Sequence, residues 1–257
     1  MESAIRKAET LIEALSYIRT FRDKLTVIKL GGSAMEDEAA LKATLQDVVF
    51  METVGMQPVL VHGGGKAIDR GMQSAGLTPK KIHGRRVTDD ATLELVVHAL
   101  LNNVNQSIIR QIRDLGGRAV GLHGEPLQCL FGEKLYLEED GESIDLGHVG
   151  SVSGVDGAMI RDFALAGVVP VIPCLAHDEE GNWLNINGDT AAAAVAGHLS
   201  AEKLVFLTDT PGILQNQSDP QSLIRHLDGQ ECHNLIQQGV IAGGMIPKVE
   251  ACLEALK

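Results

Sequence analysis

Two lysines and one aspartate, far apart in the chain, stand beside turns rich in small residues. Lys29 lies in the apolar stretch 25–30, which runs directly into two glycines; Lys248 follows another glycine pair; and Asp189 precedes a run of alanines. Glycine lets a backbone turn sharply and bring its N–H groups close to a ligand, and an ammonium group balances negative charge. These residue types suit phosphoryl transfer, which needs positioning and charge neutralisation more than a nucleophilic side chain.

The same design recurs at Pro58–Gly65, where an apolar stretch ending in His62 runs into three glycines. Ligands bind at the carboxyl ends of strands in open α/β sheets. The two places where a predicted strand runs into glycines therefore predict one anion site. His62 has no obvious nucleophile partner, and no Ser-His-Asp arrangement is indicated. The chain lacks both G-x-x-x-x-G-K-[ST] and a G-x-G-x-x-G after a strand, which disfavours a P-loop enzyme and a dinucleotide-binding protein.

Arg86 is singled out from a basic segment, Pro79–Val87, whose other charges are interpreted as solvated. It immediately precedes a predicted helix start at 87–90, for which we predict Thr88 as the N-cap. An arginine fixed beside a helix N-terminus is well placed to bind a carboxylate through its fork of N–H groups.

Two asparagines alternate with apolar residues just before Asp189. In an extended segment Asn185 and Asn187 share one face, and Asp189 lies near the start of an alanine-rich helix predicted over 191–199. Capping of that helix would explain Asp189 alone. Buried amides need partners, and a bound substrate would supply them. Lys248 lies at a helix start, where a cation is unfavourable, which is a mild indication of function.

The elements that must position these residues alternate between strands and helices. This rhythm predicts parallel strands joined by right-handed crossovers, within an α/β fold built as a three-layer αβα sandwich. Short β-like pieces between 125 and 153, separated by acidic or glycine turns such as Glu138–Gly141, predict an antiparallel hairpin. Two interpretations of this hairpin stay open: a lid over a site, or a decorative insertion. The predicted strands are 25–30, 59–61, 119–122, 168–172 and 204–207, and the predicted helices are 37–55, 66–76, 89–115, 156–166, 191–199, 229–238 and 249–256.

Residues 1–21 form an amphipathic helix by pattern, because apolar residues recur every three or four positions. They are Ile5, Ala8, Leu11, Ile12, Leu15, Ile18 and Phe21. The pattern leaves two interpretations open: a helix that packs on its own domain, or an oligomerisation arm.

Composition narrows the class of protein. The 257 residues carry a net charge of −12, which disfavours binding to nucleic acid. No apolar run is long enough to span a membrane, and the N-terminal residues lack an apolar secretory signal. The four cysteines show neither disulfide nor metal spacing, so we expect reduced thiols, a cytoplasmic protein and no metal site.

Six motifs occur in the order found in the amino acid kinase family, and with them the chain resembles that family from about residue 25 to 257. The motifs are Ile28–Gly32, Val61–Gly65, Gly84–Asp89, Asn185–Ala192, Leu207–Ile213 and Gly243–Lys248. The segment Arg86–Asp89 is similar to that of members that act on N-acetyl-L-glutamate.

The resemblance implies ATP-dependent phosphorylation of the side-chain carboxylate of N-acetyl-L-glutamate to an acyl phosphate, in arginine biosynthesis, with Mg²⁺ carried in by ATP. Two alternatives stay open: a kinase for a related acetylated or carrier-bound aminoadipate, and a catalytically weak regulatory homologue.

By matching positions, Lys29 and Lys248 would stabilise the transition state, Asp189 would orient them, and Gly32 and Gly64 would offer backbone N–H groups. The residues expected to hold the amino acid are Gly63, Gly64, Arg86, Asn185 and Asn187, with Arg86 on the α-carboxylate. The residues expected to bind the nucleotide are Asp209, Thr210, Pro211, Gly212, Ile213, Leu214, Val240, Ile241 and Ala242.

The resemblance also implies an organisation into segments. Residues 1–21 would be an oligomerisation helix, similar to the arm of arginine-inhibited hexamers, and 22–257 a kinase domain. Its amino-acid side would span about 25–175 and its nucleotide side about 176–257. We expect a homo-oligomer, either a dimer or a hexamer joined through the helix. Family members continue past the last helix with further strands, which we expect to be missing here.

Overall fold

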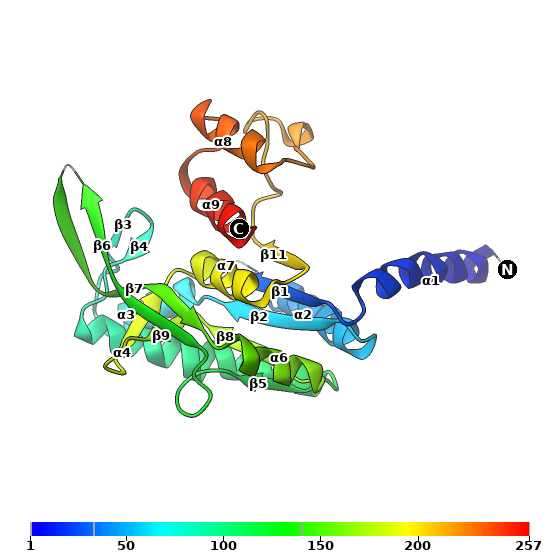
Figure 1. Cartoon of the computed structure of the whole chain (residues 1–257), viewed down its shortest axis with the longest axis horizontal. Helices are drawn as coiled ribbons and strands as arrows, with labels where there is room; N and C mark the ends of the chain where they lie inside the picture. Colours follow the sequence, from blue (N-terminus) through cyan, green and yellow to red (C-terminus); the bar gives the residue numbers. More distant parts are fainter. Residues whose placement is uncertain (1, 33, 140, 257) are drawn as a thin grey trace.

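A five-stranded parallel sheet forms the centre of the molecule (Figure 1). The computed structural model describes residues 2–32, 34–139 and 141–256. The strands are β1 (Leu25–Leu30), β2 (Gln57–His62), β5 (Ala119–Gly121), β8 (Val169–Pro173) and β11 (Lys203–Leu207), in the order β11-β1-β2-β8-β5. From β1 the chain continues to β2, which pairs with one side of β1, and the last strand, β11, pairs with the other side of β1. The crevice between β1 and β11 is therefore the switch point at which ligands bind in such sheets.

Helices cover both faces of the sheet, so the predicted three-layer α/β fold is confirmed. Apolar side chains of α2 (Glu38–Thr53) and α5 (Gln106–Asp114) pack with Ile28 and Leu30 of β1 on one face. Those of α6 (Gly157–Leu165) and α7 (Gly188–Leu199) pack with Val27 on the other. Strands buried on both faces have near-continuous apolar sequences, which is why their positions could be predicted.

A small closed barrel stands beside the sheet. It consists of β6 (Leu130–Glu139), β7 (Glu142–Val155), β9 (Leu175–His177) and β10 (Trp183–Ile186). The predicted antiparallel hairpin is confirmed as β6 and β7, but it has two long strands where the sequence indicated three short pieces. Glu138 and Glu139, interpreted from the sequence as part of a turn, lie in β6 and pair with Ser143 and Glu142 of β7. This exposed end of the hairpin projects beside β3 (Lys81–Ile82) and β4 (Arg85–Arg86) (Figure 1).

The segment predicted as one helix over 89–115 is a continuous helical run, but its middle is π-helical. It consists of α4 (Asp90–His98), the π-helical segment η1 (Ala99–Asn105) and α5. Its N-cap is Asp89, which accepts a hydrogen bond from the Thr92 N–H, so the prediction of Thr88 is wrong.

Thr88 cannot cap because β7 already engages its backbone. The Thr88 N–H donates to Leu146 O at 2.8 Å, and the His148 N–H donates to Thr88 O at 2.7 Å. The Thr88 hydroxyl donates to the Arg86 carbonyl at 2.9 Å. Thr88 thereby ties the Arg86 segment to the hairpin.

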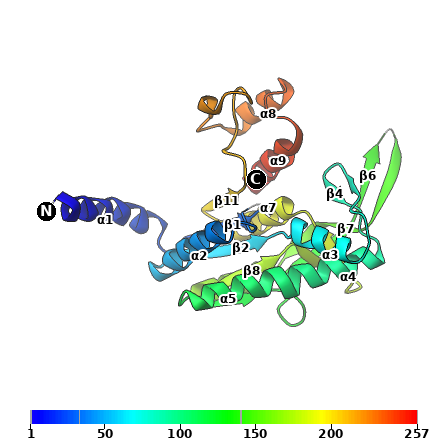
Figure 2. The ribbon, with the colours of Figure 1, turned by 180° about the vertical axis from the view of Figure 1, so that it is seen from behind.

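The remaining helices lie after the glycine turns and at the two ends of the chain. They are α1 (Glu2–Phe21), α3 (Gly65–Ser74), η2 (Pro220–Ser222), α8 (Gly229–Gln237), η3 (Gly243–Met245) and α9 (Ile246–Ala255). Both views show α1 projecting away from the rest of the molecule (Figures 1 and 2). Among the described residues, none of the helices is both long and apolar enough to cross a membrane. Pro247 lies in the first turn of α9, so this helix begins before the predicted residue 249 and includes Lys248.

Candidate active site

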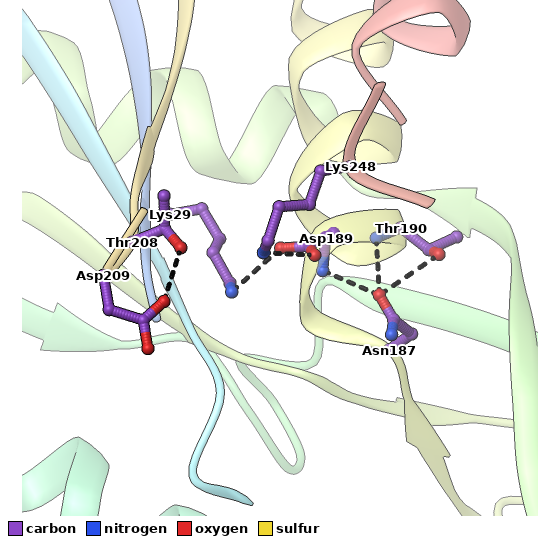
Figure 3. A network of polar contacts seen from close by, with 7 residues as sticks. All are labelled: Lys29, Asn187, Asp189, Thr190, Thr208, Asp209 and Lys248. Carbon is purple, nitrogen blue, oxygen red and sulfur yellow. Dashed lines mark hydrogen bonds and ion pairs between the residues drawn. The ribbon is translucent and has the colours of Figure 1, made fainter. Parts of the chain in front are cut away.

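Lys29, Asp189 and Lys248 meet at the carboxyl edge of the sheet, as the resemblance implied when it assigned Asp189 to orient the two lysines (Figure 3). Lys29 Nζ lies 2.8 Å from Asp189 Oδ1, and Lys248 Nζ lies 2.9 Å from Asp189 Oδ2. The three side chains come from β1, α7 and α9. Each carboxylate oxygen holds one ammonium group, so one aspartate fixes two lysines that belong to opposite ends of the chain.

The cluster has an excess of positive charge. Burial of the Asp189 carboxyl acts to raise its pKa, but the ammonium groups of Lys29 and Lys248 hold the pKa below its ordinary value. The carboxylate is therefore ionised, and with two ammonium groups around it the cluster is positive by one charge. Each ammonium has three donors, so donors remain for an anionic ligand.

Two glycines of the turns that follow β1 and β2 leave little room for a side chain. A Cβ on Gly31 would lie 2.7 Å from the carbonyl oxygen of Leu207, and a Cβ on Gly64 would lie 2.6 Å from Leu100 Cδ2. At Gly32 and Gly63 no heavy atom lies within 4 Å of an added Cβ, so both face open space. The turns thus bring bare backbone beside Lys29.

A cavity of about 260 Å³, here called the Arg86 cavity, opens beside Lys29. It brings together all five residues that the sequence assigned to the amino acid, as well as Lys29 and Gly32. Its lining residues are Lys29, Gly32, Gly63, Gly64, Gly65, Lys66, Ile68, Asp69, Lys81, Gly84, Arg85, Arg86, Val149, Cys174, Asn185, Ile186, Asn187 and Gly188.

Arg86 is buried and held by α3. Its Nη2 is paired with Asp69 Oδ1 and donates to the Gly65 carbonyl at 3.3 Å, while Nη1 contacts Met72 Sδ at 3.1 Å. Arg86 lies in β4 and not at the helix N-terminus that the sequence indicated. Its guanidinium is therefore positioned by Asp69, a residue that the sequence reasoning missed.

The two asparagines have protein partners of their own. Asn185 donates to the Thr88 hydroxyl at 3.1 Å. Asn187 Oδ1 accepts from the Asp189 N–H at 2.9 Å and the Thr190 N–H at 3.2 Å, so Asn187 caps α7. The alternative interpretation of Asp189 as the cap of this helix is wrong, because Asp189 lies inside the first turn and its carboxylate is held by the lysines. Capping does account for Asn187, although both asparagines line the Arg86 cavity.

Three other lining residues carried no clear signal in the sequence. Lys66, at the start of α3, pairs with Glu36 Oε2 at 2.6 Å. Asp69 lies on the inner side of α3, which only the packing of that helix reveals. Burial raises the pKa of the Cys174 thiol to about 11, so Cys174 stays protonated and acts as an apolar part of the wall.

A second cavity of about 460 Å³, here called the Asp209 cavity, opens beside Lys248. It brings together all nine residues that the sequence assigned to the nucleotide. Its lining residues are Thr208, Asp209, Thr210, Pro211, Gly212, Ile213, Leu214, Gln217, Val240, Ile241, Ala242, Gly244, Met245 and Lys248. The Lys29–Asp189–Lys248 cluster therefore joins two cavities, one lined by each lysine.

His62 ends β2 beneath the glycine turn and is completely buried. Burial lowers the pKa of His62 to about 4, against an ordinary value of 6.5, and the nearby His123 contributes in the same direction. The imidazole is neutral in the folded protein near neutral pH, whereas an unfolded chain takes up a proton as the pH falls below 6.5.

Replacing His62 by asparagine is expected to weaken the acid dependence of stability. Between pH 6.5 and 4 the unfolded state binds more protons, so the unfolding free energy of the parent falls as the pH falls, by roughly 3 kcal/mol for this group. Urea denaturation at several pH values in this window measures the slope. An unchanged slope in His62→Asn would contradict the assignment of this loss to His62.

Comparison with known proteins places the chain in a family. Residues 24–257 match the model of the amino acid kinase family. The chain belongs to the amino acid kinase family.

Several relatives at 40–44% identity are named acetylglutamate kinase, and two of them illustrate the match. The protein of Methanosphaera stadtmanae is 43% identical, with 97% of this chain and 86% of the relative covered. The protein of Halothermothrix orenii is 43% identical, with 100% and 88% covered. Among solved structures, smu.665 of Streptococcus mutans UA159 is 32% identical, with a TM-score of 0.77 and with 90% of this chain and 89% of that one covered.

Proposed function

We propose that the chain transfers the γ-phosphoryl group of ATP to the side-chain carboxylate of N-acetyl-L-glutamate. The observation that carries this proposal is the junction of the two cavities: Asp189 holds Lys29 in the wall of one and Lys248 in the wall of the other. Membership of the amino acid kinase family supports the reaction class. The relatives named acetylglutamate kinase support the choice of substrate.

The reaction suits a site without a nucleophilic side chain. An oxygen of the substrate carboxylate attacks the γ-phosphorus, the bond to the bridging oxygen of ADP breaks, and its electron pair leaves with ADP. Negative charge is spread over the transferring group, so fixed cations on both sides lower the barrier. Lys29 meets this charge from the acceptor side and Lys248 from the nucleotide side, and Asp189 keeps both in place.

The Arg86 cavity is suited to a dianionic amino acid whose amine is acetylated. Five cationic side chains line it, against one carboxylate, Asp69. The five are Lys29, Lys66, Lys81, Arg85 and Arg86. Two carboxylates are attracted to this lining, whereas the ammonium of a free amino acid would be repelled. Arg86 takes the α-carboxylate, and Asn185 and the glycine backbone hold the rest.

The Asp209 cavity takes ATP with its phosphates toward Lys248. Its lining combines apolar side chains such as Ile213 and Ile241 with the loop that follows β11. Small-molecule sites are typically apolar with a few polar groups that orient the ligand. Among the described residues no group of three His, Cys, Asp or Glu side chains converges as a metal site would. We infer that Mg²⁺ enters with ATP, because this ion commonly retains waters and is bound through phosphates.

We place the reaction in arginine biosynthesis and in the cytoplasm. The names of the relatives support the first. For the second, the chain has four free thiols, three of them buried, and a reducing compartment keeps thiols in this form.

A coupled assay of ADP release over a panel of acceptors tests the proposal. We expect turnover with N-acetyl-L-glutamate and much weaker turnover with unacetylated glutamate. Faster turnover with N-acetylaminoadipate would favour the longer substrate. No turnover above background by folded protein with any acceptor would reject the kinase and favour a regulatory homologue.

We further propose that α1 joins copies of this chain. The described part of the molecule leaves most of its apolar stripe uncovered, because Leu11 and Ile12 are about 70% exposed and Ile5 and Leu15 are also exposed. A second copy of the same helix offers a matching apolar face.

Deleting residues 1–21 is expected to reduce the size of the oligomer measured by light scattering. The paired change Leu11→Asp and Ile12→Asp should have the same effect, because charges on the stripe oppose its burial. Glu13→Gln, on the side of the helix away from this stripe, serves as the control and should leave the mass unchanged. An unchanged mass after the deletion would reject the arm.

A further inference from the structure

His62 and Asn105 form a buried polar pair directly under the glycine turn 63–65. Both side chains belong to residues with no exposed surface. The Asn105 amide Nδ2 lies 3.0 Å from His62 Nε2 and donates to the Val171 carbonyl at 3.1 Å. His62 Nδ1 lies 3.0 Å from the carbonyl oxygen of Gly63. Neither side chain lines either cavity, so the chemistry described above does not use them.

The partners determine which ring nitrogen carries the proton. The Gly63 carbonyl can only accept, so Nδ1 must donate to it. Nε2 must then accept, and Asn105 supplies one amide hydrogen to it while its second goes to Val171. A proton on Nε2 would face the Asn105 N–H, so this network holds the imidazole neutral and in one tautomer.

This tautomer has a consequence for the peptide that joins Gly63 and Gly64. In a trans peptide the C=O and the following N–H point in opposite directions. The imidazole is fully buried, so it draws the Gly63 carbonyl toward the interior. The Gly64 N–H is thereby turned toward the Arg86 cavity, which both glycines line.

The π-helical segment η1 supports the same turn at two points. Asn105, its last residue, holds His62, while Leu100 and Val104 lie against Gly64, with Leu100 Cδ2 only 2.6 Å and Val104 Cγ2 3.5 Å from an added Cβ. π-Helical turns inside α-helices are rare and occur frequently at functional sites. Here the wider turn places these side chains under the glycines.

We propose that His62 and Asn105 are positioning residues for phosphoryl transfer: the neutral imidazole, held by Asn105, fixes the Gly63–Gly64 peptide so that the Gly64 N–H faces the transferring group. This inference rests on the proposed function for its kinetic meaning and on the contacts of His62 for its geometry.

Kinetics of two His62 variants test the proposal. His62→Leu removes the donor to the Gly63 carbonyl and fills the buried site with an apolar side chain. It is expected to lower kcat by roughly 10²-fold, which is the effect of losing one oriented backbone donor. The KM for N-acetyl-L-glutamate should change much less. His62→Asn, which keeps an N–H donor close to the ring Nδ1 position, should recover most of kcat. Asn105→Leu should lower kcat in the same way.

Controls separate positioning from stability. Thr26→Val alters a buried polar residue at the opposite end of β1 and should leave kcat unchanged. Melting temperatures are measured for all variants. A kcat in His62→Leu close to that of the parent overturns the proposal. It is also overturned if His62→Asn loses as much kcat as His62→Leu while both melt above the assay temperature.

An NMR measurement of the free protein is independent of turnover. We expect a protonated Nδ1 and an unprotonated Nε2 for His62, and a Gly64 amide resonance that moves in His62→Leu but returns toward the parent in His62→Asn. If the parent shows this pattern but has no turnover, the proposed function fails and the positioning of Gly64 stands. A proton on Nε2, or an unmoved Gly64 amide in His62→Leu, overturns the positioning.

Discussion

Replacing Lys29 by methionine is expected to lower kcat by at least roughly 10²-fold, with a much smaller change in KM, because the lost ammonium acts mainly on charge that develops in the transition state. Lys29 is buried, and its Nζ lies 2.8 Å from Asp189 Oδ1. Methionine keeps most of the length of the side chain without its charge. Lys248→Met should have a comparable effect from the nucleotide side.

Steady-state kinetics with both substrates measure the effect, and Lys24→Met supplies the matched control. Lys24 lies just before the same strand and pairs with Glu202 on the surface, where its side chain is about half exposed. Its loss should leave kcat unchanged. A Lys29→Met protein with nearly normal kcat would remove Lys29 from the reaction, and a large rise in KM alone would assign it to binding.

Replacing Arg86 by alanine is expected to raise the KM for N-acetyl-L-glutamate by roughly 10- to 100-fold, the equivalent of the 1.5–3 kcal/mol of hydrogen bonds to a charged group. The reduction in kcat should be smaller, because the α-carboxylate is remote from the reacting carboxylate. The KM for ATP should stay the same, since Arg86 does not line the Asp209 cavity.

Two further variants refine this expectation. Asp69→Asn leaves Arg86 in place but weakens its anchor, so KM should rise less than in Arg86→Ala. Arg70→Ala, on the same helix but largely exposed and outside the Arg86 cavity, is the control. An unchanged KM in Arg86→Ala would show that another group binds the α-carboxylate.

The sequence predicted the layers and the sheet because buried parallel strands and amphipathic helices have distinct periods. The resemblance to the amino acid kinase family implied that Lys29, Asp189 and Lys248 meet, and the three residues lie together although two of them belong to helices. The residues that the resemblance assigned to the two substrates separate into two cavities.

The features that could not be predicted depend on contacts between distant segments. Thr88 has the residue type of an N-cap, but its backbone N–H and C=O are hydrogen-bonded to β7, and Asp89 is the cap. Asn187 and Asp189 are both suited to capping, and only the two lysines decide that Asp189 turns away from the helix end. The π-helical turn has no signal in the local sequence.

Trapping the product with hydroxylamine tests most directly that the Lys29–Asp189–Lys248 cluster transfers a phosphoryl group to a carboxylate. Hydroxylamine attacks an acyl phosphate, releases phosphate and leaves a stable hydroxamate. With ATP and N-acetyl-L-glutamate, the parent protein is expected to form the side-chain hydroxamate in step with ADP, and folded Lys29→Met to form almost none. Release of ADP without hydroxamate, or equal yields from the two proteins, would contradict this account of the site.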